Sequence, residues 1–193
     1  YDRRKNYIKR DAFVLMDVGG QYDHYCSDIT RTFPISGRFT GPQEEVYTAI
    51  LRTLKYATGI VKPGLRWSVL TNKTKSFMYN ELKKINLFSN SHSIKIMNSL
   101  MPHSIGHSVG LDNHDVGDLI ILKENMVIAL EPGIYFKNDM FQNNGFNKET
   151  LRRYIDMGGI RIEDTILVTK KGSRVLSNVP KEIKELTRML SNE

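Results

Sequence analysis

Apolar and polar positions alternate in two stretches near the start of the chain and predict a pair of strands over residues 11–18 and 22–33. Gly19-Gly20 lies between the two stretches, and a glycine pair is typical of a tight connection. The two strands are therefore expected to pair as an antiparallel hairpin.

Helical periodicity follows these strands. Apolar side chains recur at helical spacing at Val46, Ile50, Leu54 and Ala57. The preceding residues 40–43 (TGPQ) are typical of a capping box with proline at the first helical position. We expect this helix to stop near residues 62–64 (KPG) and a second helix to span residues 68–85.

The second half of the chain returns to strand patterns. The sequence predicts strands over residues 127–131 and 160–168, a turn at residues 132–133, irregular loops over 88–98 and 136–156, and a closing helix over 180–190. Strands and helices occur in both halves, and we find no repeat and no interdomain linker. The expected fold class is α+β, in a single domain that spans residues 1–193.

Composition places the chain among ordinary globular proteins. Its 193 residues suffice for one core, and no apolar run approaches the roughly 18 residues of a membrane span, so we expect no membrane partner. Cys26 is the only cysteine, which excludes an internal disulfide and favours a reducing, cytoplasmic location. The net charge is +7, but the basic residues are scattered and carry no RNA-binding signature, so we expect no nucleic-acid partner.

Two aspartates lie on either side of the glycine pair. In a hairpin centred between Tyr22 and Asp23, the numbers of cross-strand partners add up to 45, as do those of Asp17 and Asp28. Directly opposed residues have Cβ atoms about 4.5–5.5 Å apart, a spacing at which both carboxylates could bridge two metal ions. The alternative is a pair of solvated aspartates at the end of a hairpin.

Three histidines and two glutamates supply further candidate ligands. His103, His107 and His114 lie close together among glycines, and neutral histidine is a common ligand of transition metals. Glu131 ends an apolar strand, and Glu163 lies within the predicted strand over 160–168. Each residue alone is as well explained by a structural role, such as a hydrogen-bonded histidine or a salt bridge between Arg161 and Glu163.

The set is more informative than its members. Asp17, Asp28, Glu131 and Glu163 carry four negative charges, which two divalent cations would balance. A neutral His107 completes a mixed nitrogen and oxygen shell that suits Mn²⁺, Co²⁺ or Zn²⁺.

Six short motifs in this order resemble the pita-bread metallopeptidases, family M24, which includes methionine aminopeptidase, aminopeptidase P and prolidase. They lie at residues 16–20 (MDVGG), 27–33 (SDITRTF), 102–107 (PHSIGH), 114–117 (HDVG), 131–136 (EPGIYF) and 158–164 (GGIRIED). Within the family, residues 101–103 and 135–159 are most similar to prolidase, the Xaa-Pro dipeptidase, and residues 123–126 and 151–159 are most similar to its fungal forms. The 28–31 segment is equally similar to aminopeptidase P.

The resemblance implies roles for individual residues. Asp17 would bind one metal ion, Asp28 and Glu163 would bridge two, and His107 and Glu131 would bind the second; Mn²⁺ is the ion expected first. His103 and His114 would contact the substrate, Glu131 would also move a proton, and Arg161 would orient a ligand. The expected substrates are di- or oligopeptides that contain proline, cleaved before the proline.

Two departures from the family pattern affect the substrate and the domain. The chain begins after the opening elements of the pita-bread domain, so we expect a C-terminal catalytic domain that lacks part of its first half and forms a homodimer when complete. Prolidases also carry an arginine, between their HDVG and EPG motifs, that grips the dipeptide carboxylate; residues 118–130 contain none. Removal of an N-terminal residue before proline, as by aminopeptidase P, and a non-catalytic binding protein stay as alternatives.

Overall fold

The computed structural model describes residues 8–9, 12–89, 94–117 and 120–191. Its strands are β1 (Phe13–Val18), β2 (Gln21–Tyr22), β3 (Tyr25–Cys26), β4 (Ile29–Pro34), β5 (Val127–Leu130), β6 (Gly133–Tyr135), β7 (Gly159–Arg161), β8 (Asp164–Val168) and β9 (Ser173–Val175). Its α-helices are α1 (Gly41–Ile60), α2 (Trp67–Lys84), α3 (Met97–Leu100), α4 (Lys148–Tyr154) and α5 (Ile183–Ser191). Three short 3₁₀ helices cover Ile94–Ile96, Asn138–Gln142 and Ile155–Met157.

The first hairpin forms as predicted, but its register differs by two residues. Partner numbers add up to 47 in both β1–β4 and β2–β3, so Asp17 lies opposite Thr30. The predicted direct pairing of Asp17 with Asp28 is therefore wrong. The hairpin turns one residue later than expected, because Asp23 and His24 both adopt positive φ angles, of 47° and 67°, as the tight turn between β2 and β3 requires.

The predicted strand over 160–168 is two strands, and the predicted turn at 132–133 is an interruption between two strands. β5 pairs with β8 and β6 pairs with β7, and partner numbers add up to 294 in both pairs. The two pairs therefore follow one register, broken where Pro132 has no N–H to donate. This break places Glu131 across from Glu163.

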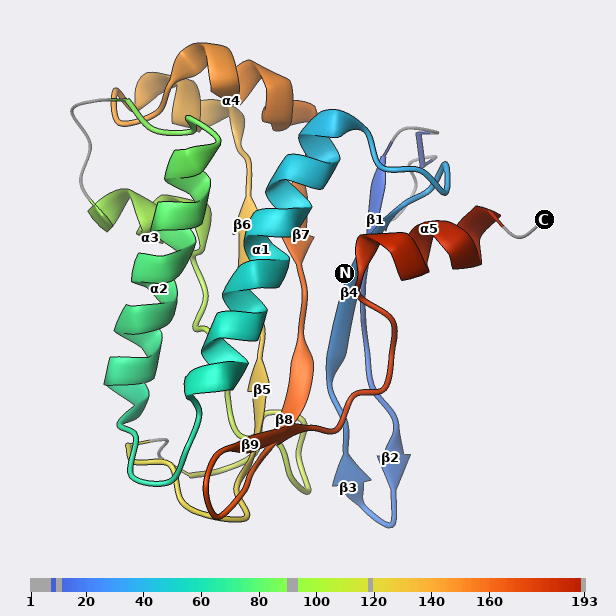
Figure 1. The fold of residues 1–193 in the computed structure, drawn as a ribbon, viewed down its shortest axis with the longest axis vertical. Coiled ribbons are helices and arrows are strands. Elements are labelled where there is room, and N and C mark those ends of the chain that lie inside the picture. The colour runs from blue at the N-terminus through green and yellow to red at the C-terminus, as the bar shows by residue number, and fades with distance from the viewer. Residues whose placement is uncertain (1–7, 10–11, 90–93, 118–119, 192–193) are drawn as a thin grey trace.

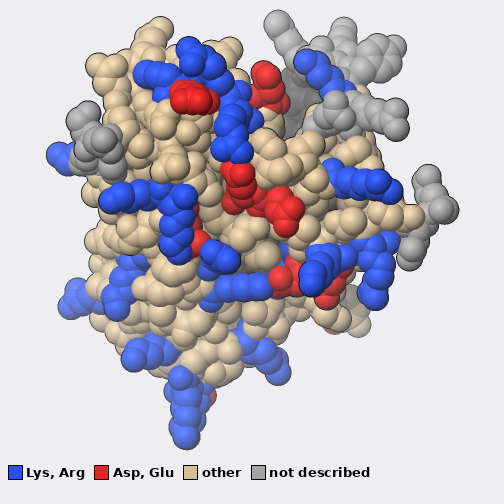
Figure 2. Space-filling model, turned by 45° about the horizontal axis from the view of Figure 1, so that its top comes forward, with Lys and Arg blue, Asp and Glu red and all other residues tan. Residues whose placement is uncertain are grey.

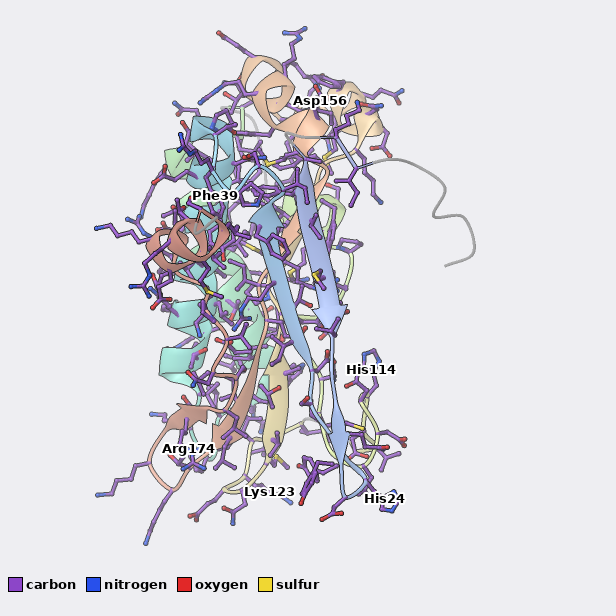
Figure 3. All side chains as sticks on the ribbon, turned by 90° about the vertical axis from the view of Figure 1, so that its right-hand side faces the viewer. His24, Phe39, His114, Lys123, Asp156 and Arg174 are labelled. Atoms are coloured by element: carbon purple, nitrogen blue, oxygen red, sulfur yellow. The ribbon has the colours of Figure 1, made fainter. Side chains whose placement is uncertain are left out.

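Backbone hydrogen bonds join the β1–β4 pair to the β5–β8 and β6–β7 pairs in one layer. The N–H of Glu163 donates to the carbonyl of Thr30 at 3.0 Å, which fixes β4 beside β7 and β8. On the other side, the N–H of Ala129 donates to the carbonyl of His107 at 2.9 Å. Strands β5 to β8 therefore lie between the β1–β4 pair and residues 105–109, which we call the histidine segment. α1 and α2 cover one side of this layer (Figures 1 and 3).

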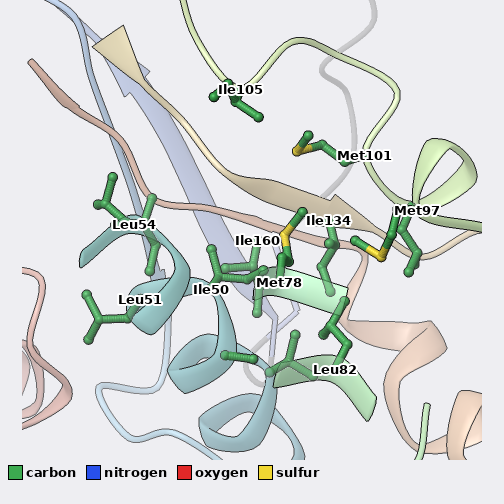
Figure 4. Packing of buried hydrophobic residues seen from close by; sticks show 14 of the residues in the cluster. Ile50, Leu51, Leu54, Met78, Leu82, Met97, Met101, Ile105, Ile134 and Ile160 are labelled. Carbon is green, nitrogen blue, oxygen red and sulfur yellow. The ribbon is translucent and has the colours of Figure 1, made fainter. Parts of the chain in front are cut away.

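The two long helices confirm the predicted periodicity. Thr40 caps α1, with its side chain accepting from the N–H of Gln43 and the Gln43 side chain returning the bond, as a capping box does. Val46, Ile50 and Leu54 of α1 are buried in one cluster with Met78 and Leu82 of α2. Figure 4 shows the packing around Ile50, Leu54, Met78 and Leu82. Burial of this apolar face anchors the layer that carries the candidate site.

The predicted loop over 136–156 is partly helical. Asn147 caps α4 by accepting from the N–H groups of Glu149 and Thr150, and Phe146, Leu151 and Tyr154 are buried. Its one α-helix and the two 3₁₀ helices beside it are each too short for periodicity to reveal them. The predicted loop over 88–98 also contains the start of α3, and residues 90–93 lie outside the described residues.

The surface has no large region of one charge on the face in Figure 2, where Lys and Arg side chains are spread around a central group of Asp and Glu. Among the described residues, no helix combines the length and apolar character that crossing a bilayer requires. The predicted closing helix is confirmed as α5, which begins at Ile183.

Candidate metal centre

Carboxylate and imidazole side chains from β1, from the ends of β4, β5 and β8 and from His107 and His114 converge in one region. Three overlapping groups each bring one possible ligand atom per residue to within 4.8 Å of the others. The groups are Asp17, Asp28 and Glu163; His107, Glu131 and Glu163; and Asp28, His107 and His114. The structure thus brings together all five side chains that the sequence suggested as metal ligands.

Asp17 and Asp28 meet although their predicted register is wrong. Side chains alternate across a strand with a period of two, so a shift of two residues leaves both carboxylates on one face of the sheet. Asp28 becomes the diagonal rather than the direct neighbour of Asp17. Gly19 makes this approach possible, because a Cβ at that position would lie 1.9 Å from the carbonyl oxygen of Ser27.

Glu131 and Glu163 approach from the break in the central strands. They lie across from each other in the shared register of β5–β8 and β6–β7. Two carboxylates directly opposed on adjacent strands repel each other. Glu163 is 1% exposed, so water does little to relieve that repulsion.

His107 reaches the carboxylates from the segment beside β5. Its Nε2 lies 3.3 Å from Asp28 Oδ2 and 3.8 Å from Glu131 Oε1. Its Nδ1 is 3.0 Å from the carbonyl oxygen of Ser108, which can only accept, so Nδ1 carries the proton. Nε2 is therefore the nitrogen that faces the acidic cluster, as a ligand histidine requires.

The neighbouring glycine fixes the path of this segment. A Cβ on Gly106 would lie 1.9 Å from the carbonyl oxygen of Ala129 in β5. Only glycine lets the histidine segment pass this close to the strand.

The other two histidines occupy different positions. The rings of His107 and His114 lie 4.1 Å apart, and the exposed His114 belongs to the group with Asp28. His103 is held by its neighbours instead, with Nδ1 2.6 Å from the Ser104 carbonyl and Nε2 3.0 Å from the Tyr135 hydroxyl. Because Nδ1 must donate to the carbonyl, Nε2 accepts from the Tyr135 hydroxyl.

Arg161 links the acidic cluster to this histidine. Its guanidinium donates to Asp17 at 2.6 Å, to the Thr30 hydroxyl at 3.0 Å and to the Tyr135 hydroxyl at 2.9 Å. The Thr30 hydroxyl in turn donates to Glu163 Oε2 at 2.6 Å. The expected simple salt bridge between Arg161 and Glu163 is thus replaced by a contact through Thr30.

Thr30 and Tyr135 are site residues that the sequence reasoning did not identify. Both lie inside motifs that were recognised, and Thr30 shares a strand face with Asp28 because the two are separated by two positions. That alternation was the available signal for Thr30. Tyr135 is recognised as a site residue only from the structure, in which β6 pairs with β7.

The site contains four carboxyl groups and few positively charged side chains to balance them. Burial raises the pKa of Glu163 to about 7, and it also raises the pKa values of Glu131 and Asp17. Burial opposes the ionised form of Asp28 too, but its hydrogen bond with His107 holds the pKa below the usual value. Against its own burial, the same contact raises the pKa of His107 to about 9.

One carboxylate oxygen that lacks a hydrogen-bond partner indicates whether these side chains suit a bound cation. Glu163 Oε1 is buried and has no hydrogen-bond partner among the described residues. A buried carboxylate oxygen beside three other acids is costly to leave without a positive partner. Oxygen donors with an imidazole nitrogen suit a divalent transition metal, so the residues present fit such an ion.

Comparisons with known proteins agree with the chemistry of these side chains. A family model described as metallopeptidase family M24 matches residues 1–170. The chain is 34% identical to the Xaa-Pro dipeptidase of Rattus norvegicus over 93% of this chain and 42% of that protein. It therefore spans less than half of that relative's length.

Two solved structures are also similar to this chain. Icp55 from Saccharomyces cerevisiae matches all of this chain and 48% of its own with a TM-score of 0.85 and 32% identity. The zinc-substituted aminopeptidase P of Escherichia coli, in complex with product, matches 92% of this chain and 41% of its own with a TM-score of 0.78 and 33% identity.

Proposed function

Because this chain belongs to metallopeptidase family M24, we propose that it hydrolyses the peptide bond that precedes a proline. Neighbours that cover 98–100% of the chain confirm the expected pita-bread fold. The observation that carries the proposal is the buried, unpaired Oε1 of Glu163 at the centre of the acidic cluster. Such an arrangement serves no evident purpose in a protein that only binds a partner, whereas a metallopeptidase needs it.

In this proposal the metal centre would hold two divalent ions. Asp17 would bind one, Asp28 and Glu163 would bridge both, and His107 and Glu131 would bind the other; Asp28 and Glu163, like His107, each belong to two of the three ligand groups. Mn²⁺ is the first candidate, with Co²⁺ and Zn²⁺ as alternatives. When bound, two such ions lower the pKa of a shared water and polarise the scissile carbonyl.

The chain's own groups handle the proton. Glu131 accepts a proton from the attacking water and passes it to the leaving proline nitrogen. It also lies within reach of both histidines, at 3.9 Å from His103 Nδ1 and 3.8 Å from His107 Nε2.

Arg161 and the histidines orient the reacting groups. Arg161 fixes one oxygen of Asp17 and, through Thr30, the carboxylate of Glu163. His114, exposed beside His107, donates to a substrate carbonyl in this proposal. His103 also faces the substrate in this proposal, and the Tyr135 hydroxyl holds its ring in one orientation.

Two substrate classes remain as candidates. Similarity to Xaa-Pro dipeptidase supports a prolidase-like activity on dipeptides that end in proline. The absence of arginine from residues 118–130 favours the second class, longer peptides with proline in second place, because no arginine there is available to grip a free carboxylate. Aminopeptidase P among the structural neighbours supports that class too.

A matched set of peptides separates them. Gly-Pro, its amide and Gly-Pro-Pro are incubated with the metal-loaded protein, and free glycine is measured. A dipeptidase cleaves Gly-Pro far faster than the amide. Comparable cleavage of the amide and the tripeptide assigns the aminopeptidase P type, and no cleavage of any of the three rejects the proposed function.

A further inference from the structure

Behind the candidate metal centre, Arg31 is buried on the opposite face of β4. It lies between Thr30 and Thr32, and because side chains alternate along a strand, it points away from the carboxylates. It is 6% exposed, which is rare for an arginine unless its charge and donors are satisfied.

Every donor of this guanidinium has an acceptor. An arginine side chain offers five N–H groups in a fixed fork. Those of Arg31 reach the backbone carbonyls of Thr30, Glu163, Val179 and Pro180 and the Oδ1 atom of Asp164. Two of these acceptors belong to the backbones from which Thr30 and Glu163 project into the site, and two belong to the segment before α5.

Asp164 completes the cluster from β8. It is 1% exposed, and its Oδ1 lies 2.8 Å from Arg31 while its Oδ2 lies 2.7 Å from Lys181 Nζ. Both carboxylate oxygens are thus paired with a cation. Asp164 follows Glu163 directly, so the ion pair also fixes the backbone that carries the central carboxylate.

The segment over residues 176–182 is held along its length. The N–H of Leu176 donates to the carbonyl of Thr165, and the hydroxyl of Ser177 accepts from the N–H of Thr165 at 2.7 Å. Further along, the hydroxyl of the buried Tyr47 donates to the carbonyl of Lys181 at 2.8 Å. These hydrogen bonds hold the segment over residues 176–182 in place beside the Arg31 guanidinium.

We propose that Arg31 is a positioning residue of the metal centre, which ties the carboxylate of Glu163 to the segment over 176–182 through Asp164. This inference rests on the proposed function for its catalytic consequence. Its physical basis is that a ligand carboxylate keeps its geometry only when the backbone and hydrogen bonds behind it are fixed. A lysine offers three donors without the planar fork, so it cannot hold both the Glu163 backbone and the Val179–Pro180 carbonyls.

The test compares Zn²⁺ affinity among variants, measured by competition with a chromophoric chelator. Arg31→Lys is expected to weaken Zn²⁺ binding by about 10- to 100-fold, the range typical of residues that orient metal ligands. The absorption spectrum of the Co²⁺-loaded protein is expected to change with it. In hydrolysis, kcat is expected to fall while KM stays near the wild-type value, because substrate contacts are unchanged.

Matched variants separate positioning from general stability. Leu82→Ala removes core volume in α2, away from this cluster, and is expected to lower the Tm without changing Zn²⁺ affinity. Asp164→Asn removes the charge that Arg31 faces, and its affinity decides the case if Arg31→Lys does not fold. Lys181→Met is expected to have a smaller effect than either, because Arg31 still holds Asp164.

Wild-type Zn²⁺ affinity and an unchanged Co²⁺ spectrum in folded Arg31→Lys would overturn the proposal, as would affinity losses in Leu82→Ala that match those in Arg31→Lys. The proposed function fails separately: a wild type that binds Zn²⁺ but cleaves no Xaa-Pro peptide leaves the affinity comparison intact.

Discussion

At the scale of single residues, Glu131 is the group whose chemistry can be tested most directly. Glu131→Gln keeps an oxygen ligand but removes the titratable group, so kcat is expected to fall by at least ~10²-fold, a typical contribution of general acid–base catalysis. The measurement is steady-state hydrolysis of an Xaa-Pro peptide at equal metal content. Near-normal turnover with full metal loading would remove Glu131 from proton transfer.

Asp28 is the residue whose loss should change the metal count. A carboxylate oxygen of Asp28 lies within 4.8 Å of possible ligand atoms of Asp17 and Glu163. In a second group, a carboxylate oxygen of Asp28 lies within 4.8 Å of ring nitrogens of His107 and His114. Asp28→Ala is therefore expected to reduce the metal content from about two ions per chain, as in two-metal sites, to one or none. Elemental analysis measures this directly.

The matched control for that experiment is Asp156→Ala. Asp156 is an exposed aspartate that Figure 3 shows at the other end of the molecule from His114. Its removal is expected to leave the metal content unchanged. Equal occupancy in both variants would defeat the bridging role of Asp28.

At the scale of elements, the close passage of the histidine segment along β5 makes one glycine indispensable. In Gly106→Ala the new Cβ would lie 1.9 Å from a backbone carbonyl, so the segment must move and carry His107 with it. Overpacking of this kind costs roughly 1–3 kcal/mol. Chemical denaturation and Zn²⁺ affinity are both expected to show a loss.

Gly59→Ala is the counterpart of that substitution. Gly59 lies in α1, and an added Cβ there meets nothing within 4 Å. Alanine inside a helix is more favourable than glycine by roughly 0.5–1 kcal/mol. This variant should gain stability, and a gain in Gly106→Ala as well would contradict the packing described for the histidine segment.

How far the sequence predicts the elements depends on how locally each is determined. The two long helices follow from periodicity and the Thr40 capping box, both local signals. The hairpin register does not, because the turn position depends on which two residues adopt positive φ. The candidate ligands still meet, since an error of two residues preserves the face of the strand.

Contacts across the sheet are harder to foresee. Thr30 and Tyr135 matter only because β4 and β6 both lie against the strand that carries Arg161. No local pattern contains that arrangement. The same holds for Arg31, whose acceptors come from the chain 130 to 150 positions away as well as from its neighbour.

At the scale of the whole molecule, the raised pKa values predict how stability depends on pH without metal. Glu163 has a pKa of about 7 in the fold and His107 about 9, both above their usual values. Between pH 5 and 9 these two groups therefore hold more protons in the folded state than in the unfolded state, so their contribution to stability falls as pH rises. Each unit of pKa shift corresponds to about 1.4 kcal/mol.

Thermal unfolding of the metal-free protein across this range measures the effect. The Tm is expected to fall from pH 5.5 to 9, with a shallower slope in Glu163→Gln, which lacks one of the titrating groups. Added metal should raise the Tm more at pH 8 than at pH 6, because its ligands must be deprotonated. A Tm that rises between pH 6 and 8.5 without metal would contradict this account.

The domain assignment and the homodimer stay predictions for the whole molecule. The chain spans 42% of the rat Xaa-Pro dipeptidase, and its fold and motif order are those of the family.

The central claim is that the acidic cluster is a metal centre that cleaves before proline. Its most direct test is the release of glycine from Gly-Pro and Gly-Pro-Pro, with Gly-Ala and Gly-Ala-Pro as the comparisons, by protein stripped with a chelator and then titrated with Mn²⁺. The account predicts no release without metal, release from at least one of the two proline peptides that saturates near two ions per chain, and a clear preference for the Gly-Pro bond. Protein that binds two ions per chain and leaves all four peptides intact would contradict it.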